Sequence, residues 1–170
     1  MEPTSEQTSR GHDLHRRLIA RLLQQAEDVR RLATGLDEEK LSRRTMPGKW
    51  SLKELVCHLR RVQHVFEGRI FSMLGEENPA LPPYEPEGDA EFDAMVRRPG
   101  ADTLAGFLRE RTLLAARLEA LAPAEWHRPG HHPEYANYDV HFAVEYLAHH
   151  EAHHLYQMLQ RRVPLGKLPH

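Results

Sequence analysis

The feature that most constrains the fold is a long connection, rich in proline and glycine, between two segments of helical periodicity. Residues 75–101 read GEENPALPPYEPEGDAEFDAMVRRPGA, far more than a turn between antiparallel helices needs. A flanking helix of about 24 residues would be roughly 36 Å long, and an extended connection of this length reaches more than twice that distance. The connection can therefore return along the full length of a helical bundle before the next helix begins.

Four segments carry helical periodicity, and none alternates convincingly enough to be a strand. The first is predicted from about His12 to Leu32. Its buried stripe comprises Leu14, Leu18, Leu22, Ala26 and Val29. The second follows Pro47 and Gly48, opens with Ser51 and Glu54 in capping-box spacing, and continues to about Leu74.

The third segment follows the long connection, and Asp102 or Thr103 is its predicted cap. Its apolar stripe comprises Leu104, Phe107, Leu108, Leu114 and Leu118. The fourth is capped by Asn137 or Asp139 and runs to about Val163, just before a proline. Together the segments predict an all-α fold: one domain over residues 1–170, a four-helix bundle that runs up-down-down-up, with the long crossover between the second and third helices.

Composition narrows the function classes. The chain of 170 residues has 23 Lys and Arg against 25 Asp and Glu, so it has no basic field for nucleic acid or an anionic membrane. A single cysteine, Cys57, excludes an internal disulfide and suits a reducing compartment. The first ten residues lack the apolar core of a signal peptide, and no apolar run is long enough to span a membrane. We expect a cytoplasmic protein.

Nine of the thirteen histidines lie in the last third of the chain, and four of them fall in the stretch HHEAHH, residues 149–154. His150, Glu151 and His154 form the H-E-x-x-H pattern that on a helix can hold zinc, with the glutamate as general base. Proteases with this pattern take a third ligand downstream. Beyond His154 the sequence offers only His170 and no carboxylate side chain, so we do not expect such a protease.

Spacing alone cannot decide which histidines share a metal, since both His150/His154 and His149/His153 are four residues apart. The apolar stripe of the fourth predicted helix distinguishes the two pairs. Its members lie within roughly 80° of His150 on a helical wheel, whereas the other pair is rotated toward the rim or solvent. The predicted ligands are His150 and His154.

A catalytic metal site usually has three protein ligands, so a third must come from elsewhere. His58 lies on the flank of the apolar stripe of the second predicted helix, and His64 points away from it. A bundle that packs the second helix against the fourth would bring His58 to the other two. The alternatives are a core histidine at position 58 and a solvated histidine-rich face at 149–154.

Most of the other residues near these ligands have two possible roles each. Glu151, the catalytic candidate, either orients an imidazole or acts as a base. Glu54 either completes the capping box or accepts the free N–H of His58, and Gln157 either binds a water on the metal or packs against a neighbouring helix end. Trp50 is expected to pack at the start of its helix, and Cys57 to be a small buried hydrophobe. Trp126, Tyr135 and Tyr138 either line a pocket above the metal or pack the loop.

Two motifs resemble those of the DinB-like superfamily of metal-binding four-helix bundles. PGKWSLKELVCHL is similar to the family's Trp-Ser opening of the second helix followed by a histidine, and HHEAHHLYQM is similar to its histidine-rich ending. The resemblance covers nearly the whole chain. It places the family's metal triad on His58, His150 and His154, and implies a homodimer, a divalent ion such as nickel or zinc and, in some relatives, transfer of low-molecular-weight thiols such as bacillithiol or mycothiol.

The leading hypothesis is therefore a metal-dependent enzyme, a thiol S-transferase or a hydrolase, that acts on a small molecule at a three-histidine site. The alternative is a non-catalytic metal-binding stress or interaction protein, in which the ion mainly joins two helices. An open ligand position on the metal would favour the enzyme, and a closed one the structural role.

Overall fold

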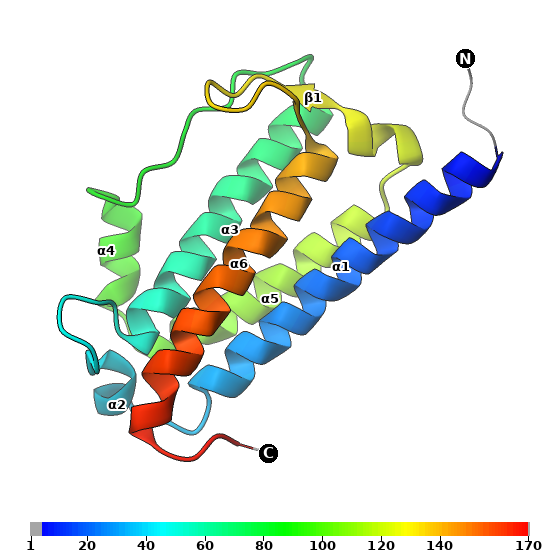
Figure 1. The fold of residues 1–170 in the computed structure, drawn as a ribbon. Coiled ribbons are helices and arrows are strands. Elements are labelled where there is room, and N and C mark those ends of the chain that lie inside the picture. The colour runs from blue at the N-terminus through cyan, green and yellow to red at the C-terminus, as the bar shows by residue number, and fades with distance from the viewer. Residues whose placement is uncertain (1–4, 170) are drawn as a thin grey trace.

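Four long helices form the body of the protein, and their arrangement is shown in Figure 1. The structure is a computed structural model that describes the backbone of residues 5–169 and the side chains of residues 11–169. The long helices are α1 (Ser5–Ala33), α3 (Leu52–Gly75), α5 (Gly100–Glu119) and α6 (Val140–Arg162). The absence of a signal peptide was predicted from residues 1–10. Residues 1–4 and the side chains of residues 5–10 lie outside the described part, as does His170.

Short elements connect the long helices. They are α2 (Glu38–Ser42), α4 (Ala90–Val96), the 3₁₀ helices η1 (Pro123–His127) and η2 (Val163–Leu165), and the strands β1 (Pro129–Gly130) and β2 (Tyr138–Asp139). The two strands pair in antiparallel fashion, with Pro129 opposite Asp139 and Gly130 opposite Tyr138. The sequence predicted no strand, because two residues are too few to show an alternating pattern.

The bundle has the predicted topology. Helix α1 packs against α5 and α6, and α3 packs against the same two helices. In Figure 1, α1 and α6 run downward while α3 and α5 run upward, so the second and third long helices are parallel. The crossover that contains α4 returns along the outside of α3, which confirms the up-down-down-up arrangement.

The helix starts were predicted with mixed success. Ser51 and Glu54 form the expected capping box of α3, and Asp139, one of the two proposed caps of α6, accepts from Phe142 N–H at 2.8 Å. The prediction for α5 is wrong: this helix begins at Gly100, before Asp102 and Thr103, and has no side-chain cap of its own. A carboxylate from α2 caps it instead, because Gly100 N–H donates to Glu38 at 2.7 Å.

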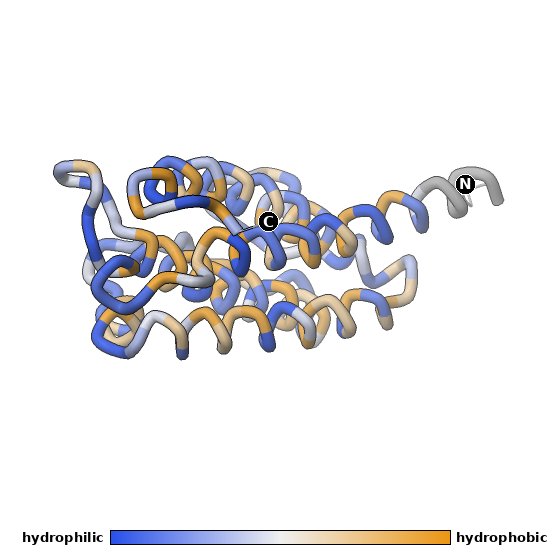
Figure 2. Tube along the Cα trace, turned by 90° about the horizontal axis from the view of Figure 1, so that it is seen from below, coloured by the Kyte–Doolittle hydropathy of each residue, from blue (hydrophilic) through white to orange (hydrophobic). Residues whose placement is uncertain are grey.

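Two groups of buried apolar residues fill the bundle. One lies toward the upper end around Leu22, Ile70 and Leu147, and the other toward the lower end around Leu52, Phe107 and Met158. Figure 2 shows the alternation of hydrophobic and hydrophilic residues along the long helices that this burial requires. Leu14 was predicted in the stripe of α1 but is 44% exposed, and the neighbouring His15 is buried in its place, stacked on Trp126.

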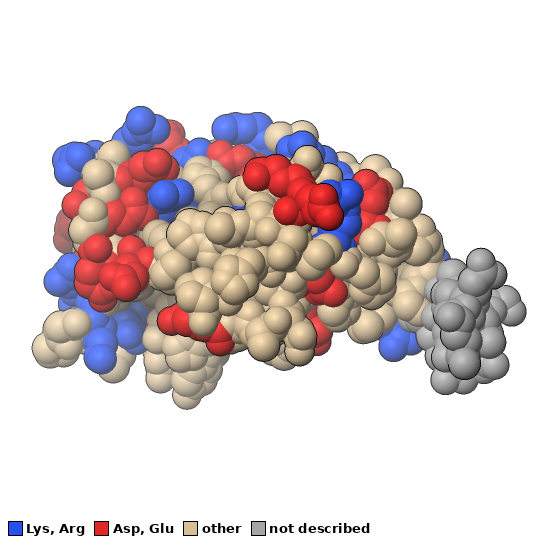
Figure 3. Space-filling view, turned by 90° about the horizontal axis from the view of Figure 1, so that it is seen from above, with Lys and Arg blue, Asp and Glu red and all other residues tan. Residues whose placement is uncertain are grey.

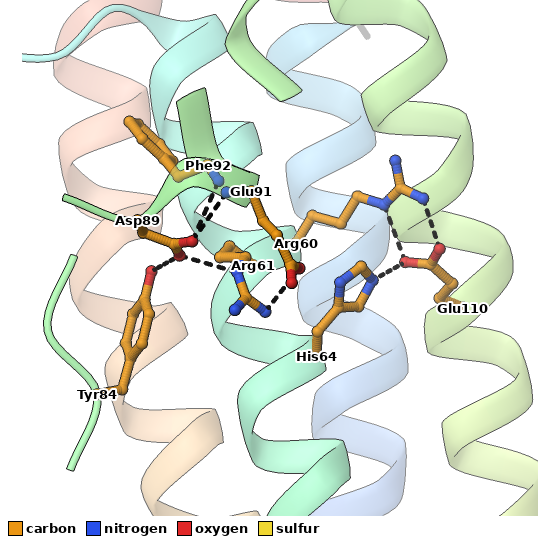
Figure 4. A network of polar contacts seen from close by, with 8 residues as sticks. All are labelled: Arg60, Arg61, His64, Tyr84, Asp89, Glu91, Phe92 and Glu110. Atoms are coloured by element: carbon orange, nitrogen blue, oxygen red, sulfur yellow. Dashed lines mark hydrogen bonds and ion pairs between the residues drawn. The ribbon is translucent and has the colours of Figure 1, made fainter. Parts of the chain in front are cut away.

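Polar networks attach α5 and the crossover to α3 (Figure 4). Glu110 of α5 accepts from Arg60 at 2.6 and 3.0 Å and contacts Nε2 of His64 at 2.8 Å. Asp89, the N-cap of α4, accepts from Arg61 and from the Tyr84 hydroxyl, both at 2.8 Å. His64 of α3 therefore faces α5 and points away from the face of α3 that carries His58, as predicted.

Within the described residues, no helix combines the length and the apolar character that crossing a membrane requires. Seen from above, the upper end has a broad central area without acidic or basic residues, with charged groups around it (Figure 3).

Candidate metal centre

His58, His150 and His154 come together between α3 and α6. His58 lies in the second turn of α3, and the other two occupy successive turns of α6 on one face. The Nε2 atom of His150 is 3.3 Å from Nε2 of His58 and 3.1 Å from Nε2 of His154. The ligand atoms of all three lie within 4.8 Å of one another. Residues about ninety positions apart thus form the cluster that the helical pattern predicted.

The separations between these nitrogens fit a shared metal ion. Bonds of about 2.1 Å, at angles between octahedral and tetrahedral, put two imidazole nitrogens about 3.0 to 3.4 Å apart. Three neutral nitrogens that direct their lone pairs at one another repel unless a cation or a shared proton lies between them. The geometry of the donors therefore suits a divalent ion bound through three Nε2 atoms.

Burial keeps these imidazoles neutral, the form that binds a metal. Desolvation, and then the neighbouring imidazoles, lower the pKa of His58 to about 3 and that of His150 to about 4. Burial also lowers the pKa of His154, although the contact with Gln157 acts in the opposite direction. At neutral pH no proton has to leave these rings before a metal binds.

Gln157 fixes the orientation of one ligand. Its Oε1 lies 2.8 Å from Nδ1 of His154, so Nδ1 is the protonated nitrogen that donates and Nε2 keeps its lone pair for a metal. Two roles were considered for Gln157, binding of a water on the metal and packing against a helix end, and the structure shows a direct contact with the ligand His154 instead. Nδ1 of His58 and Nδ1 of His150 are buried and have no hydrogen-bond partner among the residues that the structure describes.

The residues predicted beside His58 separate into two groups. Trp50 packs at the start of α3 as expected, and its ring lies 4.8 Å from that of His58, between centroids. Glu54 does not reach the imidazole: its carboxylate accepts from Ser51 N–H at 2.8 Å and from Arg44 at 3.0 Å. Cys57 is fully buried, and burial raises the pKa of its thiol to about 11. It is the small buried hydrophobe that was expected.

The remaining histidines of the HHEAHH stretch lie outside the cluster. The His149 side chain is exposed and lies 3.9 Å from Glu145, and the His153 ring contacts Gln157 at 3.2 Å. The helical wheel therefore separated the two pairs correctly, because one side of α6 faces α3 and the other faces solvent.

Glu151 requires a correction. It was expected near the imidazoles, but it is completely buried and both of its oxygens accept from Arg111, at 2.8 and 2.6 Å. Arg111 also donates to Gln63 Oε1 and to the backbone carbonyl of Leu22, each at 2.7 Å. This network links all four long helices. A carboxylate so engaged neither orients a ligand nor reaches a substrate.

The three histidines line a cavity of about 340 Å³ that is open to solvent. Its walls also include Trp50, Phe66, Arg69, Tyr84, Tyr135, Tyr138 and Tyr146. Tyr135 and Tyr138 thus line the pocket, whereas Trp126 packs elsewhere, stacked on His15 with 4.0 Å between centroids. The size and the mainly aromatic walls are typical of a small-molecule site.

Sequence reasoning missed Arg69, Phe66 and Tyr146 as pocket residues. The first two had a usable signal, because Phe66 and Arg69 follow His58 by two and three helical turns and share its face of α3. Tyr146 lies one turn before His150 on α6, and its ring stacks on that of Phe66 at 5.4 Å between centroids. Residues that follow a ligand on its own face are thus candidates for the substrate wall.

Comparisons with known proteins agree with the fold and the motifs. A family model described as the DinB superfamily matches residues 21–158. The uncharacterized protein YuaE of Bacillus subtilis strain 168 is 26% identical over 140 residues, which cover 73% of this chain and 84% of YuaE. YfiT from Bacillus subtilis, described as a probable metal-dependent hydrolase with an unusual four-helix bundle topology, superposes with a TM-score of 0.77 over 97% of this chain and 91% of its own. At 19% identity, YfiT shows the fold alone.

Proposed function

This chain belongs to the DinB superfamily, and from that premise we propose that it is a metal-dependent hydrolase of a small molecule. One divalent ion, nickel or zinc, is held by His58, His150 and His154. The observation that carries the proposal is the position of the three Nε2 atoms, which converge on the wall of an open cavity. YfiT, which has the same fold and is described as a probable metal-dependent hydrolase, supports the same reaction class.

The open cavity favours an enzyme over a purely structural ion. A structural site is usually closed by a fourth protein ligand, whereas a catalytic site leaves positions for water and substrate. Such an ion, when bound, lowers the pKa of water or of a thiol and polarises a carbonyl. The chain itself supplies neutral imidazoles, the Gln157 contact that fixes His154, and the mainly aromatic walls of the cavity.

Hydrolysis and thiol transfer would use the same histidines. In thiol transfer, a low-molecular-weight thiol would share the cavity with an electrophile, and the two reactions differ in whether turnover needs that thiol. Glu151 has no part in either reaction, since Arg111 occupies both of its oxygens.

Elemental analysis of untagged protein tests the metal site. We expect close to one nickel or zinc ion per chain, loss of that ion in His58→Ala, His150→Ala and His154→Ala, and retention in His149→Ala, the matched control on the same helix. Equal loss from all four variants would refute the assigned ligands. Retention in all four would leave no metal role for this cluster.

Activity of the metal-loaded protein then separates the functions. The protein is incubated with a panel of small esters and amides, and with electrophiles in the presence and absence of bacillithiol or mycothiol. Product that depends on metal but not on thiol supports the hydrolase, and product that needs the thiol supports the transferase. A loaded protein that is inert with every substrate favours the non-catalytic alternative.

A further inference from the structure

Arg69 is a buried cation in the wall of the histidine cavity. Arg69 is only 9% exposed, and it lines the same cavity as the three histidines. It follows His58 by eleven residues on α3, which places it three turns away and about 20° from the same face. The guanidinium and the imidazole cluster therefore border one cavity at different heights along α3.

Neutral groups hold the guanidinium in place. One Nη donates to the Tyr138 hydroxyl at 3.2 Å, and the other donates to the carbonyl of Pro82 at 2.8 Å. The guanidinium also lies over the ring of Phe66, 5.0 Å from its centroid. Two of the five N–H groups are thus bonded, and Nε has no hydrogen-bond partner in the described part of the chain.

Arg69 lacks the carboxylate that a buried arginine normally requires. No Asp or Glu among the described residues lies within 4.0 Å of its guanidinium, whereas Arg111, which is fully buried, is paired with Glu151. Arg161 and Arg162 are also buried, but they lie in the last turn of α6, where the helix dipole favours a cation. Arg69 lies in the interior of α3 and has no such compensation.

The cavity that Arg69 borders contains one carboxylate, Glu134, but this residue is exposed and forms no ion pair with Arg69 within 4.0 Å. His132, whose ring stacks on Tyr138 at 5.2 Å between centroids, lines the same cavity. Burial, and then the charge of Arg69, lower the pKa of His132, so this neighbour is kept neutral. A bound ligand that brought a negative charge would supply the missing partner of Arg69.

We propose that Arg69 binds a carboxylate or phosphate group at one end of an elongated substrate whose reacting group lies at the three histidines. The inference rests on the proposed metal-dependent function and names the substrate class. Because Arg69 reaches back over Phe66, the anion lies about eight residues of helix beyond His58, or roughly 12 Å. The stacked rings of Phe66 and Tyr146 line the path between the two ends and suit an apolar or planar body.

A matched pair of metal-binding probes tests this geometry. Suberic monohydroxamate and octanohydroxamate have the same chain length and the same metal-chelating group, but only the first ends in a carboxylate. Affinities are measured by calorimetry on the metal-loaded protein. We expect the wild type to bind suberic monohydroxamate at least about tenfold more tightly, as a charge-assisted hydrogen bond to the buried guanidinium implies.

Variants assign the preference to one residue. Arg69→Met should bind both probes with the affinity that the wild type has for octanohydroxamate. Arg69→Lys should keep part of the preference, since it keeps the charge without the planar fork. Arg117→Met, which removes an exposed arginine of α5 outside the cavity, should behave as the wild type. Unchanged octanohydroxamate binding shows that Arg69→Met is folded.

The outcomes distinguish the two proposals. Equal affinity of the wild type for both probes, with metal bound, overturns the role of Arg69 and leaves the metal site standing. This comparison needs no variant, so it decides the question even if Arg69→Met fails to fold. A wild-type protein that takes up no metal or binds neither probe overturns the proposed function, and the present inference with it.

Discussion

Glu151 and His150 are neighbours in the sequence, yet they face different layers of the bundle. A step of one residue turns a helix by about 100°, which moves the side chain from the α3 side of α6 to the centre where all four long helices meet. The H-E-x-x-H pattern shows only that the two histidines share a face. The identity of the residue opposite Glu151, Arg111 of α5, could not be read from the pattern, because it lies forty residues away.

Replacement of Glu151 by Gln is therefore expected to affect folding rather than the metal. The change leaves the fully buried Arg111 without its anion, and breaking such a pair costs about 3 kcal/mol or more of unfolding free energy. Denaturant unfolding measures the loss, and elemental analysis of the folded fraction should show an unchanged metal content.

The double variant Arg111→Met/Glu151→Leu is the control for this prediction. It removes both charges at once and should recover much of the lost stability, because no buried charge remains unpaired. If Glu151→Gln unfolded like the wild type but lost turnover at a constant metal content, a catalytic role for Glu151 would have to be reinstated.

The site residues that were identified from the sequence differ from the missed ones in how clearly the sequence pattern marked them. His58, His150 and His154 could be assigned because each lies on the flank of an apolar stripe, where an imidazole is unusual. Arg69 shares the face of His58, but its residue type gave no indication of burial, since most arginines on a helix lie at the surface and its burial depends on Tyr138 and Pro82 from other segments. Gln157 was recognised as a site residue, but its partner depended on a rotamer that a helical wheel does not specify.

At the scale of elements, local signals located the long helices, and tertiary contacts set some of their ends. The caps of α3 and α6 were predicted because Ser51 and Asp139 act on their own helices. Helix α5 begins at Gly100 because Glu38, sixty-two residues earlier, accepts the first N–H. The same carboxylate pairs with the buried Lys53 of α3, so α2 joins the starts of two long helices.

Removal of this carboxylate should loosen the lower end of the bundle. Glu38→Ala deprives the α5 N-terminus of its cap and the buried Lys53 of its anion, and we expect a loss of about 1 to 2 kcal/mol in unfolding free energy. Glu39→Ala, which removes only an exposed ion pair with Arg43, should change stability by less than about 0.5 kcal/mol. Chemical denaturation compares the two. Equal effects would mean that Glu38 does not cap α5 in solution.

At the scale of the whole molecule, the crossover determined the topology and could be recognised from its length. A connection of this length permits parallel neighbours, and α3 and α5 are parallel. The path of the crossover over the cavity, where Tyr84 and Pro86 form part of the wall, could not be predicted because irregular loops have no periodicity. The homodimer implied by the family resemblance stays a prediction that light scattering can test.

The position of the histidine cluster couples metal binding to global stability. His58 comes from α3 and the other two ligands come from α6, so the complete site exists only when these helices are packed together. A ligand that binds only the folded state raises the unfolding free energy by about 2.7 kcal/mol at a free concentration one hundred times its dissociation constant. The metal-loaded wild type should therefore melt at a higher temperature than protein treated with a chelator.

Thermal melts of His58→Ala and His149→Ala, with and without a chelator, complete this prediction. His58→Ala should lose most of the metal-dependent increment, because two ligands on one helix can bind an ion without requiring α3. His149→Ala should keep it, since its side chain is exposed on the far side of α6. A core histidine at position 58 makes the opposite forecast: stability would fall equally with and without metal, and the increment would persist. In that case the ion would not join α3 to α6, and the likeness to metal-dependent relatives would be one of fold alone.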